Sequence, residues 1–148
     1  MKRILFVDDD RRLVAGLKRL FHGKRELWDV TTCSDPVAAV ALVQQQPFDL
    51  VISDMRMPVM DGAALLDEVK RLRPSVLRVV LTGQCDVSAS QRAMHVAHQF
   101  LVKPLDGDRL IEAVQRLFFV QETVGEAELR QVVGGVTALP SAPQVYRQ

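Results

Sequence analysis

Residues 4–10 read Ile-Leu-Phe-Val-Asp-Asp-Asp, a short apolar run that ends in three carboxylates. An unbroken run of large apolar residues is typical of a strand buried on both faces of a parallel sheet. Leucines at helical spacing follow as far as Phe21, and Asp10 is placed to cap the start of that helix. The stretch therefore predicts a strand, an acidic junction and then a helix.

The alternation of strand and helix continues along the chain. We expect further strands at 28–32, 49–53, 76–81 and 100–102, and helices at 36–46, 65–72, 88–96 and 110–118. Five strands, each followed by a helix, indicate an α/β fold: a doubly wound parallel sheet with right-handed crossovers and five flanking helices. In such a sheet ligands bind at the carboxyl ends of the strands.

The composition is that of an ordinary globular chain. Its 148 residues suffice for one domain, or one domain and a tail; 48% are hydrophobic and 25% are charged. A formal net charge of +1 gives no field that would attract a nucleic acid. The cysteines and histidines lack metal-ligand spacing, and there is no signal-peptide or membrane-span pattern. We expect a soluble cytoplasmic protein, with its histidines at the surface or at helix ends.

Chemically active side chains stand at the ends of four predicted strands. Acids occupy positions 8–10 and 54, Thr82 ends the fourth strand, and Lys103 follows the fifth. Each alone has a plain structural explanation as a cap, a turn or a surface group. Parallel strands end at one edge of a sheet, so these groups should converge. Carboxylates within ~4 to 6 Å raise one another's pKa unless a cation lies among them, which favours Mg²⁺ as an occupant.

Four motifs carry a family resemblance. ILFVDDD, SDMRMPVMDG, VVLTG and FLVKP occur in this order and spacing, and together they resemble the receiver domain of two-component response regulators over residues 1–121. The resemblance implies a flavodoxin-like fold of five strands and five helices. It also implies a phosphorylation-controlled signalling module of a bacterial protein, whose only catalysis is its own phosphotransfer and dephosphorylation.

The resemblance assigns roles to individual residues. Asp54 matches the phosphoacceptor, and Lys103 matches the lysine that pairs with the phosphoryl group. Asp8 and Asp9 match the acids that hold Mg²⁺ together with Asp54, and the backbone carbonyl of Arg56 would be a further ligand. A carboxylate can attack phosphorus when charge on the transferring group is neutralised and the groups are held in line.

The resemblance also implies a switch. Thr82 matches the switch hydroxyl and Phe100 the aromatic switch residue, and the Lys103-Pro104 bond is expected to be cis. Arg56 and Gln84 stand two residues after the phosphoacceptor and the hydroxyl. They are expected to tune the dephosphorylation rate.

The pattern changes after Gln121. Gly125 and Gly134 interrupt any long amphipathic run, so residues 122–148 are expected to be a helical linker and the truncated start of an output domain. The segment containing Leu139, Pro140 and Pro143 is similar to the L-P-x-x-P turn that opens HDOD domains. The alternative is a tail that docks on its own receiver domain.

The implied partners are a histidine kinase or phosphotransfer protein, the output domain of the native protein, and a second copy of the chain in a homodimer. Direct nucleic-acid or membrane binding is not expected. Two other functions remain open from the sequence. One is a pseudo-receiver that acts only as an interaction surface. The other is a haloacid dehalogenase-type phosphohydrolase, which requires D-x-D-x-T/V; here Asp8 and Asp10 fit, but Arg12 replaces Thr or Val.

Overall fold

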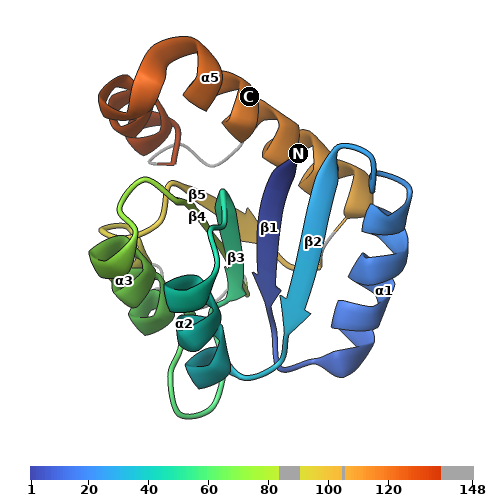
Figure 1. The fold of residues 1–148 in the computed structure, drawn as a ribbon. Helices are drawn as coiled ribbons and strands as arrows, with labels where there is room; N and C mark the ends of the chain where they lie inside the picture. The colour runs from blue at the N-terminus through green and yellow to red at the C-terminus, as the bar shows by residue number, and fades with distance from the viewer. Residues whose placement is uncertain (84–90, 105, 138–148) are drawn as a thin grey trace.

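The computed structural model describes residues 1–83, 91–104 and 106–137, with side chains described up to residue 123. Within these residues, five parallel strands form one sheet in the order β2-β1-β3-β4-β5 (Figure 1). The strands are β1 Lys2–Val7, β2 Trp28–Cys33, β3 Leu50–Asp54, β4 Leu77–Thr82 and β5 Gln99–Val102. The helices are α1 Arg11–His22, α2 Pro36–Gln45, α3 Gly62–Leu72 and α5 Gly107–Thr137. The predicted α/β class with a doubly wound parallel sheet is confirmed.

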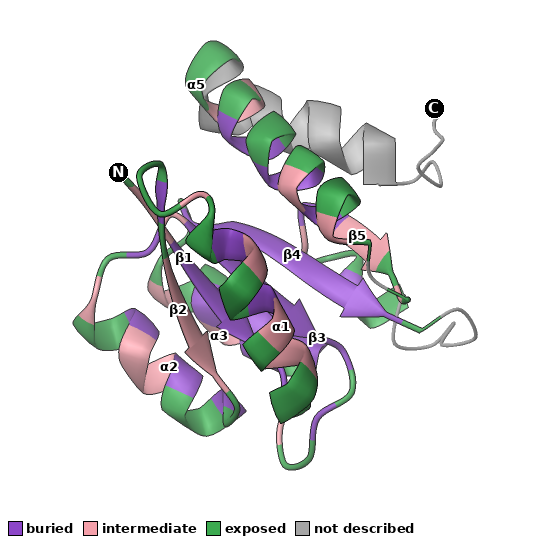
Figure 2. Ribbon diagram, turned by 90° about the vertical axis from the view of Figure 1, so that its right-hand side faces the viewer, coloured by how far each residue is buried: buried purple, intermediate pink, exposed green. Residues whose placement is uncertain are grey.

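The sheet separates two apolar cores because side chains alternate along each strand. Leu5, Val51 and Val80 face α2 and α3, whereas Phe6, Ile52 and Leu81 face α1 and α5. Figure 2 shows β3 and β4 buried throughout, between helices that are exposed on their outer sides. The strand ends are therefore the part of the sheet that remains open to ligands.

Aspartates cap the start of three helices, and the cap of α1 by Asp10 was predicted from the sequence. The side chains of Asp10, Asp35 and Asp61 each accept hydrogen bonds from backbone N–H groups in the first turn of α1, α2 and α3. These caps lie at the carboxyl edge of the sheet, so they also fix the loops that surround it.

The strand limits differ slightly from the predicted ones. β1 begins at Lys2 because Lys2 pairs in register with Trp28. β3 begins at Leu50, one residue later than predicted, and Asp49 just before it accepts a hydrogen bond from the Arg3 N–H with its carboxylate at 2.7 Å. Trp28 itself packs between Phe21 and Phe118, which ties α5 to the first strands.

A buried arginine fixes the segment between β4 and β5. Arg78 is only 4% exposed, and its guanidinium donates to the carbonyl oxygens of Val96, Pro74 and Val76 at 2.6, 3.1 and 2.9 Å. The Val96 carbonyl is thereby drawn toward β4. Of the expected 88–96 helix, residues 91–93 are helical and 94–96 form turns, whereas residues 84–90 lie outside the described part.

The position of His98 corrects a prediction. The sequence predicts histidines at the surface or at helix ends, but His98 is buried. Its Nδ1 accepts a hydrogen bond from the Arg78 backbone N–H at 3.0 Å. The imidazole thus serves as an acceptor for the β4 backbone just before β5 begins.

The last helix is longer than expected. α5 continues without a break from Gly107 to Thr137, across the predicted boundary at Gln121. Helical backbone tolerates an isolated glycine at a cost of ~1 kcal/mol, so Gly125 does not end it. The proline-containing stretch after residue 137 lies outside the described part of the chain.

Candidate functional site

The predicted acids and lysine meet at the carboxyl edge of the sheet. The Lys103 Nζ lies 2.8 Å from Asp54 Oδ1 and 3.4 Å from Asp8 Oδ2. Asp8, Asp9 and Asp54 each offer a carboxylate oxygen, and these oxygens all lie within 4.8 Å of one another. Asp8 and Asp9 follow β1, Asp54 ends β3 and Lys103 follows β5. β1 pairs directly with β3, and β4 lies between β3 and β5. The sheet itself therefore builds the cluster.

The surroundings of Asp8 disfavour the ionised form of its carboxyl group. Asp8 is fully buried, and its Oδ1 accepts the Asp10 backbone N–H at 2.9 Å. Burial raises the pKa of Asp8, and the nearby Asp54 carboxylate raises it further, while the Asp10 N–H and Lys103 only partly compensate. A second cation near Asp8 would therefore stabilise the ionised form of this carboxyl group.

Lys103 stays charged although it is partly buried. Burial alone would lower its pKa, but the hydrogen bond and charge of Asp54, with a smaller contribution from Asp8, outweigh this and raise the pKa of Lys103. The predicted cis bond between Lys103 and Pro104 is confirmed. The ammonium group is therefore held as a permanent positive charge against the acids.

The other predicted residues surround this cluster to different degrees. Thr82 is buried as the last residue of β4, and its hydroxyl donates to the Gly83 carbonyl at 3.2 Å. Phe100 is half-buried and packs against the core beneath α2 and α3. Arg56 is exposed just beyond β3, and Gln84 lies outside the described residues.

Gly62 belongs to the site but was not singled out from the sequence. A Cβ atom at this position would lie 2.3 Å from the Asp54 carbonyl oxygen and 2.9 Å from the Met55 Cα. The Gly62 N–H also donates to the Met55 carbonyl at 2.8 Å. The first residue of α3 is thus packed directly on the backbone that presents Asp54. The Asp61-Gly62 pair, which reads as ordinary turn chemistry, was the available signal.

The donor set fits a small, hard divalent cation. Three carboxylates supply only oxygen ligands, and the Asp8 carboxylate is fully buried. Asp54 is 7% exposed and Asp9 is exposed, so the cluster opens to solvent on one side. Mg²⁺ bound in proteins keeps several waters, and a site open to solvent on one side suits it for that reason.

Asp8→Asn is expected to stabilise the metal-free protein. Because folding raises the pKa of Asp8, its stabilising contribution is present at acid pH and is lost as pH rises through the folded-state value. At neutral pH a neutral isostere should therefore raise the free energy of unfolding by about 1 kcal/mol, a typical size for one substitution. Denaturant unfolding in EDTA measures this.

Added Mg²⁺ should reverse the order, because it stabilises the parent chain by binding only the folded state. Asp67→Asn, the same change at an exposed position of α3, serves as the control. A lower stability of Asp8→Asn than of the parent in EDTA would contradict the assigned electrostatics.

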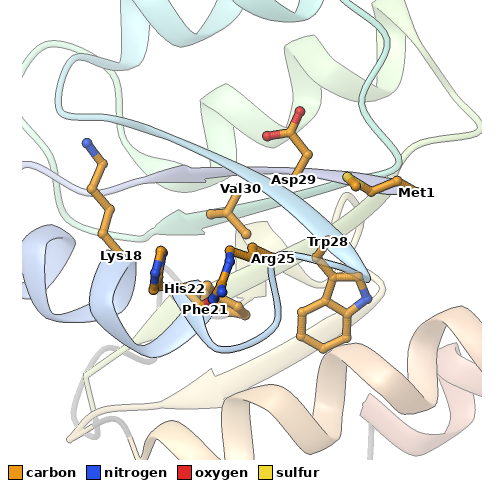
Figure 3. Close-up of a pocket in the computed structure, with 8 residues that line it drawn as sticks. All are labelled: Met1, Lys18, Phe21, His22, Arg25, Trp28, Asp29 and Val30. Atoms are coloured by element: carbon orange, nitrogen blue, oxygen red, sulfur yellow. The ribbon is translucent and has the colours of Figure 1, made fainter.

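A groove at the opposite edge of the sheet is separate from this cluster. It encloses about 340 Å³ beside the amino end of β2, where Trp28 forms part of its wall (Figure 3). Its lining residues are Met1, Lys18, Phe21, His22, Arg25, Trp28, Asp29 and Val30. None of the predicted site residues contributes to it. Within the described residues, no helix is both long enough and apolar enough to cross a membrane.

Known proteins share both the sequence pattern and the fold. The chain is 37% identical over 125 residues to the transcriptional regulatory protein ZraR of Salmonella typhimurium, which covers 83% of this chain and 28% of ZraR. The chain thus spans about a quarter of the length of such curated relatives.

Solved structures agree with the architecture. A CheY-like response regulator receiver domain protein from Methanospirillum hungatei JF-1 has a TM-score of 0.77 and 27% identity, covering 82% of this chain and 97% of that one. The receiver domain of the sensor histidine kinase PA1611 from Pseudomonas aeruginosa PAO1, crystallised with magnesium in its active-site cleft, has a TM-score of 0.69 and 23% identity, covering 78% and 95%.

The family model of the response regulator receiver domain matches residues 4–115, from β1 into α5. That range contains every acid of the cluster together with Thr82, Phe100 and Lys103. The chain belongs to the response regulator receiver domain family, and it is a signalling module of two-component systems.

Proposed function

We propose that this chain accepts a phosphoryl group on Asp54 from a phosphohistidine of a histidine kinase or phosphotransfer protein. The observation that carries the proposal is the contact of Lys103 Nζ with Asp54 Oδ1 at 2.8 Å, inside a cluster of two further carboxylates. An ammonium group held at the reacting carboxylate can also pair with the negatively charged oxygens of an incoming phosphoryl group and so stabilise the transition state of the transfer.

The transfer balances without any further reactant. The phosphorus–nitrogen bond of the donor breaks, and a phosphorus–oxygen bond to an Asp54 carboxylate oxygen forms. The imidazole nitrogen of the donor keeps the electron pair and takes up a proton from solvent. The product is an acyl phosphate, whose hydrolysis returns Asp54 to its starting state and makes the signal reversible.

Mg²⁺ would be held by Asp8, Asp9, Asp54 and the Arg56 carbonyl. When bound, it supplies neutralisation of the phosphoryl oxygens. Asp8 contributes a carboxylate that gains from a cation because burial raises its pKa. The magnesium in the active-site cleft of the PA1611 receiver domain supports the same assignment.

Switching would use Thr82 and Phe100. The Thr82 hydroxyl, which donates to the Gly83 carbonyl in this structure, would turn to a phosphoryl oxygen, and the half-buried Phe100 would rotate into the space it leaves. A coupling of ~1 to 3 kcal/mol is typical of such transitions and changes partner affinity about 5- to 150-fold. A partner or a second copy of the chain would read the altered surface.

The output lies beyond the receiver domain. We propose domains at residues 1–121 and 122–148, the second being a linker and the start of an HDOD-like output domain in a longer cytoplasmic protein. The L-P-x-x-P pattern supports it. A phosphohydrolase is disfavoured because the chain belongs to the receiver family, and a pseudo-receiver is disfavoured because the acids and Lys103 are all in place.

Intact-mass measurement after incubation with acetyl phosphate and Mg²⁺ tests the proposal. We expect the mass to rise by one phosphoryl group, and we expect no rise when EDTA replaces Mg²⁺. An unchanged mass in Mg²⁺, or the same labelling in EDTA, would contradict it.

Arg56→Ala is expected to shorten the lifetime of the phosphorylated form by about fivefold while phosphorylation stays within about twofold, because removing a long side chain beside the acyl phosphate admits water. The decay of the phosphorylated mass after removal of acetyl phosphate measures the effect. Arg116→Ala, an exposed arginine on α5, is the matched control. Gln84 is expected to act in the same way, so Gln84→Ala belongs in the same series. Equal lifetimes of the phosphorylated form in all of these proteins would show that neither Arg56 nor Gln84 sets the dephosphorylation rate.

A further inference from the structure

The loop between Asp54 and α3 contains a strained residue. Val59 has a backbone φ of +73°, the one positive value among the described non-glycine residues. The Met60 N–H donates to the Pro58 carbonyl at 2.8 Å, so Val59 is the central residue of a three-residue turn. A turn of this hand is rare and strained. For a β-branched residue a positive φ is a true outlier.

The residues on either side hold this turn in place. Met57 is buried and Met60 packs against the same apolar core. Asp61 caps α3 by accepting the Ala64 N–H at 2.9 Å, and its carboxylate is also paired with Arg92. The strain at Val59 is therefore imposed by well-anchored neighbours.

The side chain of Val59 buries almost no apolar surface within the molecule. It is 94% exposed, more than any other large hydrophobic residue among those the structure describes. Glycine or asparagine would occupy this backbone conformation at lower cost. Strain that persists without an internal contact is a reason to look for an external one.

The position of the loop decides what that contact is. The loop extends past the carboxyl ends of the strands, at the edge where Asp54 lies (Figure 1). Because Asp54 is only 7% exposed, a protein that delivers a phosphoryl group must approach over this edge. We propose that Val59 is a recognition residue that inserts its side chain into an apolar depression on the phosphohistidine-bearing protein. The inference rests on the proposed function and names part of the surface its protein donor touches.

Two phosphoryl donors separate recognition from chemistry. Acetyl phosphate is too small to reach Val59 and Asp54 together, whereas a protein donor covers both. The protein probe is the autophosphorylated histidine kinase of the same organism that transfers fastest to the parent chain. Val59→Asn and Val59→Gly should slow that transfer about tenfold, the worth of one buried valine side chain. Their labelling by acetyl phosphate should stay within about twofold of the parent.

Matched variants test the physical reason. Val59→Ile keeps both the apolar contact and the strain, so its transfer from the kinase should stay within about twofold. Val59→Gly relieves the strain and should raise the folding equilibrium constant about three- to tenfold. Leu27→Asn alters an exposed apolar residue beside the amino end of β2 and should leave transfer unchanged.

Each arm has an outcome that overturns the proposal. If Val59→Asn and Val59→Gly accepted the phosphoryl group from the kinase at the parental rate, Val59 would not contact the kinase. Equal losses with kinase and acetyl phosphate would assign the effect to a disturbed Asp54 instead. Lower stability of Val59→Gly would refute the strain. Failure of the parent chain itself to accept a phosphoryl group from acetyl phosphate would overturn the proposed function, and this inference with it.

Discussion

Asp54→Asn is expected to lower phosphorylation by acetyl phosphate and Mg²⁺ by more than about a thousandfold, the size of effect seen when a nucleophile is removed. The amide keeps the shape of the side chain but offers no anionic oxygen to attack phosphorus. Lys103 would retain its contact with Asp8 at 3.4 Å, so the site should keep its fold. A time course of intact mass measures the loss.

Asp67→Asn makes the same chemical change at an exposed position of α3 and should behave as the parent. Denaturant unfolding of both variants checks that lost labelling does not follow from lost structure. A phosphoryl group that appeared on Asp54→Asn at the parental rate would place the acceptor at another side chain, with Asp8 and Asp9 as the first candidates by position.

The part of the site that could be predicted follows from strand periodicity. Apolar runs that end in Asp8, Asp54 and Thr82 predict buried parallel strands, and parallel strands bring their ends together. The contact of Lys103 with Asp54 then needs only the correct strand order. For this reason four separate motifs, each ambiguous alone, were sufficient to locate the cluster.

Other features of the fold depend on tertiary contacts, which produce no periodic pattern in the sequence. Arg78 interrupts an apolar strand, and its guanidinium is accommodated through contacts that include the Pro74, Val76 and Val96 carbonyls. The turn at Val59 contradicts local preference, since a β-branched residue argues against a positive φ. In both cases tertiary contacts outweigh the intrinsic preference of the residue.

The length of α5 is a further feature that the sequence pattern does not predict. Glycine and the change of apolar pattern after Gln121 suggested an interruption, yet helical backbone continues to Thr137. Glycine lowers helix stability by only ~1 kcal/mol, which an established helix can absorb. Composition alone therefore marks where a helix weakens and leaves its end undetermined.

Gly62→Ala is expected to destabilise the protein by about 3 kcal/mol, the upper range for a forced insertion into a packed site. The added methyl would meet the Asp54 carbonyl oxygen at 2.3 Å and the Met55 Cα at 2.9 Å, and both are backbone atoms that cannot rotate away. Either α3 or the end of β3 must move, so the labelling rate with acetyl phosphate should fall as well. Denaturant unfolding and the intact-mass time course measure the two effects.

Gly16→Ala is the matched control for this substitution. Gly16 lies within α1, where an added Cβ meets only the tip of Arg19 at 3.9 Å. The same change should therefore raise the free energy of unfolding by about 0.5 to 1 kcal/mol through helix propensity alone, with labelling unaffected. Gly62→Ala with parental stability and labelling rate would show that the contact between α3 and Asp54 can relax. In that case the close packing would not be what positions the phosphoacceptor.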